Sequence, residues 1–290
     1  MVETDRGAFI RQSMRQSWAP RTRAYTREAL VNTAAHTAVL LRLVPPRTGE
    51  RVLDVASGPG TVAIEAAKLV GPQGSVLATD LTPEWAEVIA ERSAESGVRN
   101  VTFRSMGAET LDLPDESFAV AYCQFGLMFV PDPVQALREM RRVLLPGGRL
   151  GIVVWSTVDK VPHFAVFSQL LAPHGFAPPV PPEQQMPTPL ALGGPGLIDG
   201  HVAAAGFRDV HVARHTLDFV IESPEAGWQN RVEHGQPNVQ EAVRRLSAEA
   251  RERLRTQVIE ALSRYVRPAA EGGDGQVRLP SEAIYVSAVR

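Results

Sequence analysis

The stretch Val52-Leu53-Asp54-Val55-Ala56-Ser57-Gly58-Pro59-Gly60 joins an apolar strand to a helix through a turn of small residues. Glycines in such a turn let backbone amides come close to a ligand, and the N-terminus of the following helix carries a partial positive charge. Twenty residues after Gly60, a second apolar strand ends in Asp80, whose carboxylate can accept hydrogen bonds from both hydroxyls of a ribose. Together these features predict a nucleoside site. The alternative is a tight turn followed by an aspartate that only caps a helix.

Strands and helices alternate on both sides of this turn. The expected strands are 51–56, 75–79, 101–105, 118–124 and 149–155, and the expected helices are 25–44, 61–70, 83–96, 133–144 and 239–266, the last with a break near Ser247. Strands that alternate with helices of this length are typical of right-handed βαβ units in a parallel sheet. The sequence therefore predicts the α/β class.

The composition limits the class of protein. The 290 residues are 44% apolar and 21% charged with a formal net charge of −2, which lacks the basic excess of a general nucleic-acid binder. The apolar stretch 118–130 is shorter than the roughly 18 residues that span a bilayer, and no charged leader with an apolar core opens the chain. The single cysteine, Cys123, excludes an internal disulfide and a cysteine-based zinc site, and no H-E-x-x-H pattern or carboxylate cluster suggests a metal. We expect a cytoplasmic protein with a small-molecule partner, no membrane insertion and no nucleic-acid partner, in an oligomeric state that the sequence leaves open.

Two kinds of nucleoside site compete for the glycine turn. The pattern Gly58-x-Gly60-x-x-Ala63 fits the dinucleotide fingerprint G-x-G-x-x-[GA], which indicates a nicotinamide or flavin enzyme. The same stretch resembles motif I of the class I S-adenosylmethionine (SAM)-dependent methyltransferases, [DE]-x-G-x-G-x-G. Three later segments are similar to further motifs of that family: 77–82 (LATDLT) to the second motif, 106–118 (MGAETLDLPDESF) to the adenine-side segment, and 144–150 (LLPGGRL) to the turn before the fifth strand.

Over residues 50–156 the chain is therefore identified as a member of this family. The resemblance is closest to the branch that contains the ubiquinone/menaquinone-biosynthesis C-methyltransferases and small-molecule natural-product methyltransferases. It implies a Rossmann-like, seven-stranded, mostly parallel sheet with a reversed last strand, helices on both faces and an N-terminal helical cap, with SAM as cofactor and S-adenosylhomocysteine (SAH) as product. The implied layout is a cap at 1–46, a methyltransferase domain at 47–290, closing strands at 209–221 and 282–289, a Pro-rich substrate-side insertion at about 160–200 and a helical lid at about 223–268.

The resemblance also assigns cofactor-binding roles residue by residue. At the methionine portion, Asp54 would reach the cofactor, Tyr25 would cover the carboxylate, and the backbone at Ala56, Gly58 and Gly60 would meet the amino and carboxylate ends. At the nucleoside, Asp80 would hold the ribose, Leu81 would pack on adenine, and Ala108 would donate its N–H to the adenine edge beside Glu109. Gln124 and Phe125 would border the sulfonium.

Two positions depart from the family pattern. Ala56 replaces the first glycine of motif I, a mild change if its backbone φ stays below zero. Gly107 stands where the family usually has aspartate, so a side-chain acceptor for the adenine amino group is missing. That contact passes to Glu109 or to water, or is lost at a cost of about 1 kcal/mol.

The acceptor side is less sharply defined by the sequence. A general base is needed only where the acceptor must lose a proton, and His163 is the candidate, with a structural loop residue at a helix start as the alternative. Candidate acceptor-pocket residues, about half of which plain core packing would explain, are Met128, Phe129, Phe164, Phe167 and Trp228. The expected acceptor is a small, largely apolar metabolite, methylated at carbon or oxygen, which suits secondary metabolism. Two hypotheses stay open beside it: an NAD(P)-dependent oxidoreductase, and a SAM-binding protein of this fold that catalyses a non-methyl reaction.

Overall fold

The computed structural model describes residues 3–174, 186–233, 237–267 and 275–290. The chain divides into two compact units, which are interleaved in the sequence. The first unit consists of Met1–Ser156, Glu183–His215 and Ala283–Arg290, and the second of Thr157–Pro182 and Thr216–Glu282. No helix within the described ranges is both long and apolar enough to cross a bilayer.

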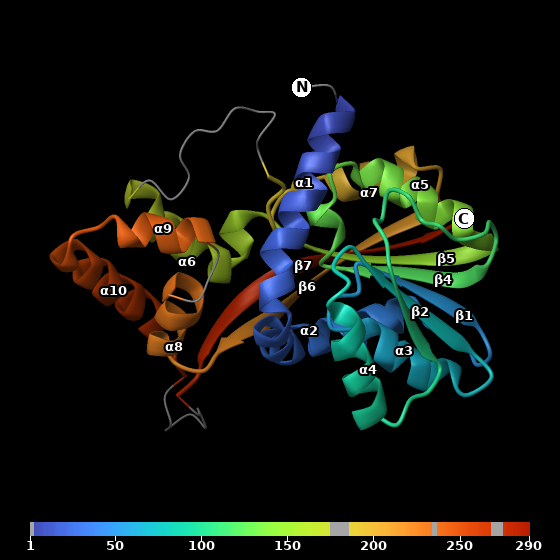
Figure 1. Cartoon of the computed structure of the whole chain (residues 1–290), viewed down its shortest axis with the longest axis horizontal. Coiled ribbons are helices and arrows are strands. Elements are labelled where there is room, and N and C mark those ends of the chain that lie inside the picture. The colour runs from blue at the N-terminus through green and yellow to red at the C-terminus, as the bar shows by residue number, and fades with distance from the viewer. Residues whose placement is uncertain (1–2, 175–185, 234–236, 268–274) are drawn as a thin grey trace. The chain divides into compact units, whose positions relative to one another are not determined.

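The described residues form a seven-stranded sheet with the order β3-β2-β1-β4-β5-β7-β6 (Figure 1). The strands are β1 Arg51–Val55, β2 Ser75–Asp80, β3 Val101–Ser105, β4 Phe118–Gln124, β5 Leu144–Trp155, β6 Arg208–Ile221 and β7 Val277–Val289. Strands β1 to β5 pair in parallel, whereas β7 runs antiparallel to β5. The central strands read as continuous apolar runs because both of their faces are covered. This confirms the predicted mostly parallel sheet with a reversed last strand.

Helices cover both faces of the sheet in the first unit (Figure 1). They are α1 Glu3–Trp18, a 3-10 turn Ala19–Arg21, α2 Thr22–Leu43, α3 Thr61–Val70, α4 Trp85–Glu95, a 3-10 turn Leu127–Phe129, α5 Pro133–Val143 and α7 Leu197–Ala204. Helices α2, α3 and α4 lie on one side of the strands, and α5 and α7 lie on the other. Within the predicted cap at 1–46 the chain is helical from Glu3 to Leu43, and this part belongs to the same compact unit as strands β1 to β5.

Two strands are longer than the sequence indicated. β5 begins at Leu144, five residues before the expected start, because Leu144 pairs with Phe118 ahead of a register shift to the pair Val120 and Arg149. The expected turn Pro146-Gly147-Gly148 is therefore a bulge inside the strand. β7 begins at Val277, ahead of the expected residue 282.

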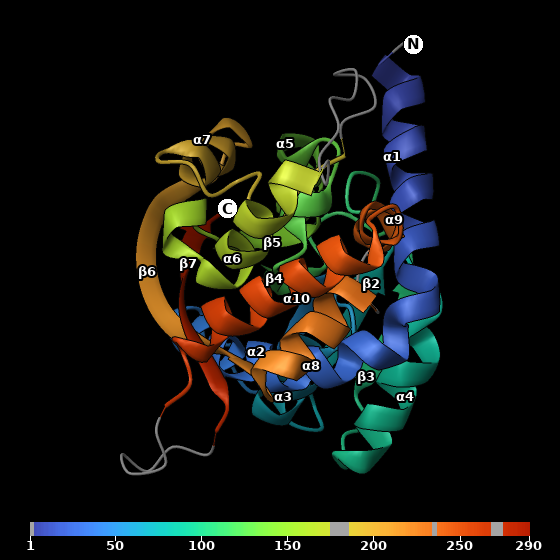
Figure 2. The ribbon, with the colours of Figure 1, turned by 90° about the vertical axis from the view of Figure 1, so that its left-hand side faces the viewer.

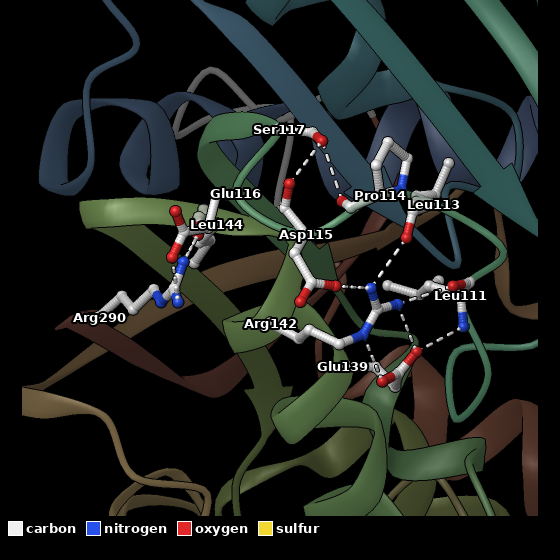
Figure 3. Close-up of polar contacts among 10 residues, drawn as sticks. All are labelled: Leu111, Leu113, Pro114, Asp115, Glu116, Ser117, Glu139, Arg142, Leu144 and Arg290. Atoms are coloured by element: carbon white, nitrogen blue, oxygen red, sulfur yellow. Dashed lines mark hydrogen bonds and ion pairs between the residues drawn. The ribbon is translucent and has the colours of Figure 1, made fainter.

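Arg142 of α5 fixes the loop that leads from the adenine-side segment into β4 (Figure 3). Its guanidinium donates to the carbonyl oxygens of Leu111 and Leu113, each at 2.8 Å, and to the Asp115 carboxylate at 2.5 Å. Glu139, one turn earlier on α5, binds the same guanidinium at 2.8 Å and accepts the backbone N–H of Leu111 at 2.9 Å. The motif L-P-D-E-S thus has a structural role, since it holds the loop after β3 against α5.

The second unit is mainly helical. It contains a 3-10 turn Val158–Lys160, α6 Pro162–Leu171, a 3-10 turn Ala172–His174, α8 Pro224–Trp228, a π-helical turn Gln229–Glu233, α9 Pro237–Arg244 and α10 Ala248–Ser263. α10 lies beside α6 and α8 (Figure 2). The expected break near Ser247 is confirmed, because its hydroxyl accepts the N–H of Ala250 and caps α10. The predicted lid region is therefore helical, while its role as a lid stays a prediction; part of the predicted Pro-rich insertion, 175–185, lies outside the described residues.

Candidate active site

The turn after β1 is closed by two carboxylates. Asp54 is 1% exposed and accepts the backbone N–H of Ala63, in the first turn of α3, at 3.0 Å. Asp80, at the end of β2, accepts the N–H of Gly58 at 3.0 Å with one oxygen and that of Thr82 at 2.9 Å with the other. Asp80 therefore joins the tips of β1 and β2. Asp80 does not cap a helix, because α3 and α4 have Gly60 and Glu84 as N-caps and neither of these residues makes a side-chain capping bond. Its carboxylate still has capacity for further donors, such as ribose hydroxyls.

Two residues other than glycine adopt left-handed backbone conformations at the carboxyl ends of neighbouring strands. Ala56 follows β1 with φ of 53°, and Phe125 follows β4 with φ of 54°. The replacement of glycine by Ala56 was expected to be mild if φ stayed below zero, and this condition is not met. The alanine keeps the conformation that a glycine would adopt here without steric cost. Non-glycine residues held in this region store strain that the surrounding structure must support, and such residues cluster at functional sites.

A cavity in the first unit opens at these strand ends. It encloses about 1060 Å³ of space not filled by atoms, open solvent included. Ten of the eleven predicted cofactor residues line it: Tyr25, Asp54, Ala56, Gly58, Asp80, Leu81, Ala108, Glu109, Gln124 and Phe125. Gly60 is not in the wall; it lies behind it as the left-handed N-cap of α3, where an added Cβ would meet Ile89 at 3.0 Å. Of the predicted acceptor residues Phe129 lines the cavity, whereas Met128 is buried at 3% exposure outside its lining.

Helix α1 supplies a wall that the sequence reasoning missed. Arg11, Met14 and Trp18 line the cavity, and the Trp18 ring packs edge-on against Tyr25 at 4.8 Å and Phe129 at 6.0 Å between centroids. The sequence does carry a signal, because Trp18 and Tyr25 are seven residues apart, a spacing that places two side chains on one face of a helix. Basic residues such as Arg11 are more typical of a solvated helix face, so their presence in this segment gives no sign of a role in the cavity.

The tip of β4 is supported from α2. The hydroxyl of Thr37 lies within hydrogen-bond distance of both amide atoms of Gln124, at 3.0 and 3.2 Å. Phe125 stacks on Trp155 at 4.2 Å between centroids and meets the ring of His36 edge-on. Both side chains at the end of β4 are thus held by buried neighbours.

The remaining predicted site residues, His163, Phe164, Phe167 and Trp228, belong to the second unit. His163 is 1% exposed, its Nδ1 lies 2.7 Å from the hydroxyl of Ser281, and its ring stacks on Phe219 at 4.0 Å between centroids. The guanidinium of Arg231 covers the rings of Phe164 and Phe167 at 5.3 and 5.4 Å. The roles of these residues toward an acceptor stay predictions.

The electrostatics of the cavity are set by buried carboxylates. Burial raises the pKa of Asp54 to about 8, against the opposing hydrogen bond from Ala63, and it raises the pKa of Asp80 to about 6. Asp54 is the more deeply buried of the two. In Glu109, burial raises the pKa and the neighbouring Arg11 opposes the shift. Such a wall favours a ligand that brings positive charge or hydroxyl donors. Among the described residues, no group of three or more histidine, cysteine or acidic side chains has a geometry that suits a metal ion.

The buried carboxylate of Asp54 makes the stability of the ligand-free protein depend on pH. Its pKa is about 3.8 when unfolded and about 8 when folded, so between these values the folded state retains a proton that the unfolded state has released. We expect the free energy of unfolding to fall as pH rises through this range, by up to about 1 kcal/mol per pH unit from this group. Urea unfolding at pH 5, 6 and 7 should show a shallower decline in Asp54→Asn than in the unaltered protein. Parallel declines in the two proteins would contradict the assignment.

Part of this chain matches a methyltransferase family and curated methyltransferases. The model of the ubiE/COQ5 methyltransferase family matches residues 34–173, just under half of the chain. The ubiquinone/menaquinone biosynthesis C-methyltransferase UbiE of Pseudomonas fluorescens (strain SBW25) is 39% identical over 132 residues, which cover 45% of this chain and 50% of that protein. The chain thus spans about half the length of the curated relatives it matches.

Solved structures extend the likeness of fold beyond the matched segment. The YcgJ protein of Bacillus subtilis has a TM-score of 0.56 at 19% identity and covers 88% of this chain and 97% of that one. Phosphoethanolamine N-methyltransferase 2 of Haemonchus contortus, solved in complex with SAM, has a TM-score of 0.52 at 18% identity and covers 88% of this chain and 52% of that one.

The sheet order, the turns that carry the motifs and the match over residues 34–173 agree with the predicted resemblance to the class I SAM-dependent methyltransferases. Within that class, residues 34–173 resemble the ubiE/COQ5 branch.

The cavity fits SAM, the cofactor of that class. The Ser57 hydroxyl, in the turn after β1, is buried and has no hydrogen-bond partner among the described residues, so it is available to a ligand. A Cβ added at Gly58 would meet no atom within 4 Å, which shows that the turn faces open space. Asp54 and Asp80 offer carboxyl oxygens to a cofactor that carries a sulfonium, an ammonium and ribose hydroxyls, and the positive charge of such a cofactor would favour their ionised forms.

Proposed function

We propose that this chain is a cytoplasmic enzyme that transfers a methyl group from SAM to a carbon or oxygen of a small, largely apolar metabolite. One observation carries the proposal. Three of the four motifs that resemble those of the family are far apart in the sequence, yet their turns after β1, β2 and β3 line one cavity, together with the turn after β4. In this site Asp54 and the turn 56–60 would hold the methionine portion, Asp80 the ribose, and Leu81 and Ala108 the adenine.

When bound, SAM supplies a methyl group already activated by its sulfonium, so the protein acts mainly by positioning the reactants and excluding water. Trp18, Tyr25, Phe125 and Phe129 give the cavity an aromatic lining. Aromatic faces attract cations and also pack against apolar groups, so they suit both the sulfonium and an apolar acceptor. Gln124, fixed by Thr37, contributes a polar amide to this lining at the tip of β4.

The relatives support an acceptor class. Those matched over residues 34–173 are C-methyltransferases of ubiquinone/menaquinone biosynthesis, which favours carbon as the accepting atom and an apolar molecule of the quinone kind. The segments after residue 173 lie outside the matched range. The finer choice of acceptor is therefore expected to differ from that of the relatives.

Calorimetric titration with SAH, with NAD and NADP alongside, tests the cofactor. We expect micromolar binding of SAH and no response to NAD or NADP. Tight binding of NAD(P) without SAH would replace the proposal by an oxidoreductase. With SAH binding established, transfer of a labelled methyl group from SAM to a panel of hydroxyquinones and phenols tests the reaction. SAH binding without transfer to any of them would favour a SAM-binding protein that catalyses a non-methyl reaction.

His163 stays the candidate general base. In His163→Ala we expect turnover to fall while SAH affinity is kept. Because His163 is buried against Phe219 and Ser281, the variant's stability must be measured beside its activity, and Ser281→Ala, which removes only the partner of Nδ1, serves as the comparison. Full activity of a folded His163→Ala protein across neutral pH would rule out the assignment.

A further inference from the structure

Arg11 occupies the end of the cavity formed by the adenine-side segment. Its Nη1 lies 3.3 Å from each carboxylate oxygen of Glu109, across 98 residues of sequence. The side chain of Glu109 is 12% exposed and that of Arg11 is 38% exposed. Both residues line the cavity together with Gly107 and Ala108. Among the described residues Nε and Nη2 of Arg11 have no acceptor, so most of its donors are available to a ligand.

Two glycines lie beside the Arg11 side chain. A Cβ at Gly107 would lie 3.8 Å from Cδ of Arg11, and a Cβ at Gly7, one turn earlier on α1, would lie 3.2 Å from its Nη1. Neither glycine has a positive φ, so the backbone alone does not require glycine at these positions. Glycine inside a helix costs about 1 kcal/mol relative to alanine, which makes Gly7 unfavourable unless the space that it leaves is used.

We propose that Arg11 is a specificity-determining residue that reads the purine base of the cofactor together with Glu109, in place of the carboxylate absent at position 107. The inference rests on the proposed function, because it concerns the base of SAM. It adds to that function a residue from α1 that the sequence motifs do not contain.

The chemistry of the pair matches one base and opposes its deaminated form. A guanidinium offers only donors and a carboxylate offers only acceptors. Adenine presents an amino donor beside an acceptor nitrogen, so Glu109 can accept from the amino group while Arg11 donates to the ring nitrogen. Hypoxanthine presents an oxygen in place of the amino group and an N–H in place of the acceptor nitrogen. With each side chain held in the position that suits adenine, Glu109 then faces the oxygen and Arg11 faces the N–H, so both contacts are lost.

The test compares calorimetric affinities for SAH and S-inosylhomocysteine, which differ only in this edge of the base. The unaltered protein should prefer SAH by about tenfold or more, the scale expected when buried polar groups lose their partners. In Arg11→Met and in Glu109→Gln that preference should fall severalfold. Arg15→Met, at an exposed position one turn further along α1 and outside the cavity lining, is the matched control and should leave it unchanged.

A rescue variant separates base reading from a structural role of the ion pair. Gly107→Asp has room for a side chain, because the added Cβ meets only ordinary contacts, and it returns the missing acceptor. In the Arg11→Met background it should restore preference for SAH. Equal weakening of both ligands in Arg11→Met, or an SAH preference near one in the unaltered protein, would overturn the inference while leaving the proposed function standing. Failure of the unaltered protein to bind SAH at all would overturn both.

Discussion

Replacing Asp80 by alanine is expected to weaken SAH binding by about 5- to 150-fold, the equivalent of roughly 1–3 kcal/mol for charge-assisted hydrogen bonds left unmade. Two losses contribute. The ribose hydroxyls would lose their acceptor, and the backbone N–H groups of Gly58 and Thr82 would lose theirs, so the turn that forms the cavity wall is loosened as well. Calorimetric titration with SAH measures the combined effect.

Asp80→Asn divides these contributions. The amide oxygen can accept one of the two backbone N–H groups but offers no second anionic oxygen, so its affinity should fall between those of the unaltered protein and Asp80→Ala. Asp112→Ala, which removes an exposed aspartate paired with Arg104 outside the cavity lining, is the control for a change of surface charge. Unchanged affinity in Asp80→Ala would remove Asp80 from the ribose role.

Replacing Gly126 by alanine is expected to lower the free energy of unfolding by about 1–3 kcal/mol, the usual cost of overpacking. The new Cβ would lie 2.4 Å from Cβ of Ala56 and 3.1 Å from Sγ of Cys123. Gly126 itself has φ of −105°, which alanine adopts freely, so the effect isolates the steric overlap from backbone strain. Urea unfolding with tryptophan fluorescence gives the value.

The overlap predicts a strong coupling with position 56. Ala56→Gly alone should stabilise the protein by up to about 1 kcal/mol, because it relieves a left-handed alanine. In the double variant the Cβ clash disappears and most of the Gly126→Ala loss should be recovered, apart from the contacts with Sγ of Cys123 and with the backbone oxygen of residue 56. A double-mutant cycle in which the two effects simply add would show that the turns after β1 and β4 do not meet as described.

The sequence predicted the parallel core well because local signals and tertiary structure agree there. The turn from Val52 to Gly60 needs glycines for its backbone, and the strands that flank it are buried on both faces, so each reads as an apolar run. The predicted start of β5 was wrong because Pro146-Gly147-Gly148 has a composition typical of turns, while pairing of Leu144 with Phe118 keeps the chain in the sheet. The sequence shows only the local turn signal, and the pairing between strands, which it does not show, outweighs that signal.

The same contrast holds in the site. Residues named by motif, such as Asp54 and Asp80, line the cavity because their positions at strand ends follow from the sheet. Arg11 and Met14 come from a helix whose docking depends on contacts with residues far away in the sequence. The conformation of Ala56 was missed for a related reason, since its φ is set by how the turn connects β1 to α3 and not by the residue's own preference.

The position of β7 has a consequence for how the chain is made. Strands β1 to β5 are complete by Trp155, yet the neighbour that covers β5 is β7, which starts only at Val277. The ribosome adds about 5–20 residues per second, so β7 begins to be synthesised roughly 6–24 s after β5 is complete. For β6, which ends at Ile221 and also lies beside β7, the delay is roughly 3–11 s. During that interval a nascent chain exposes an apolar strand edge of the kind that templates aggregation. We therefore expect a higher yield of folded protein when nascent chains are shielded by chaperones or kept apart.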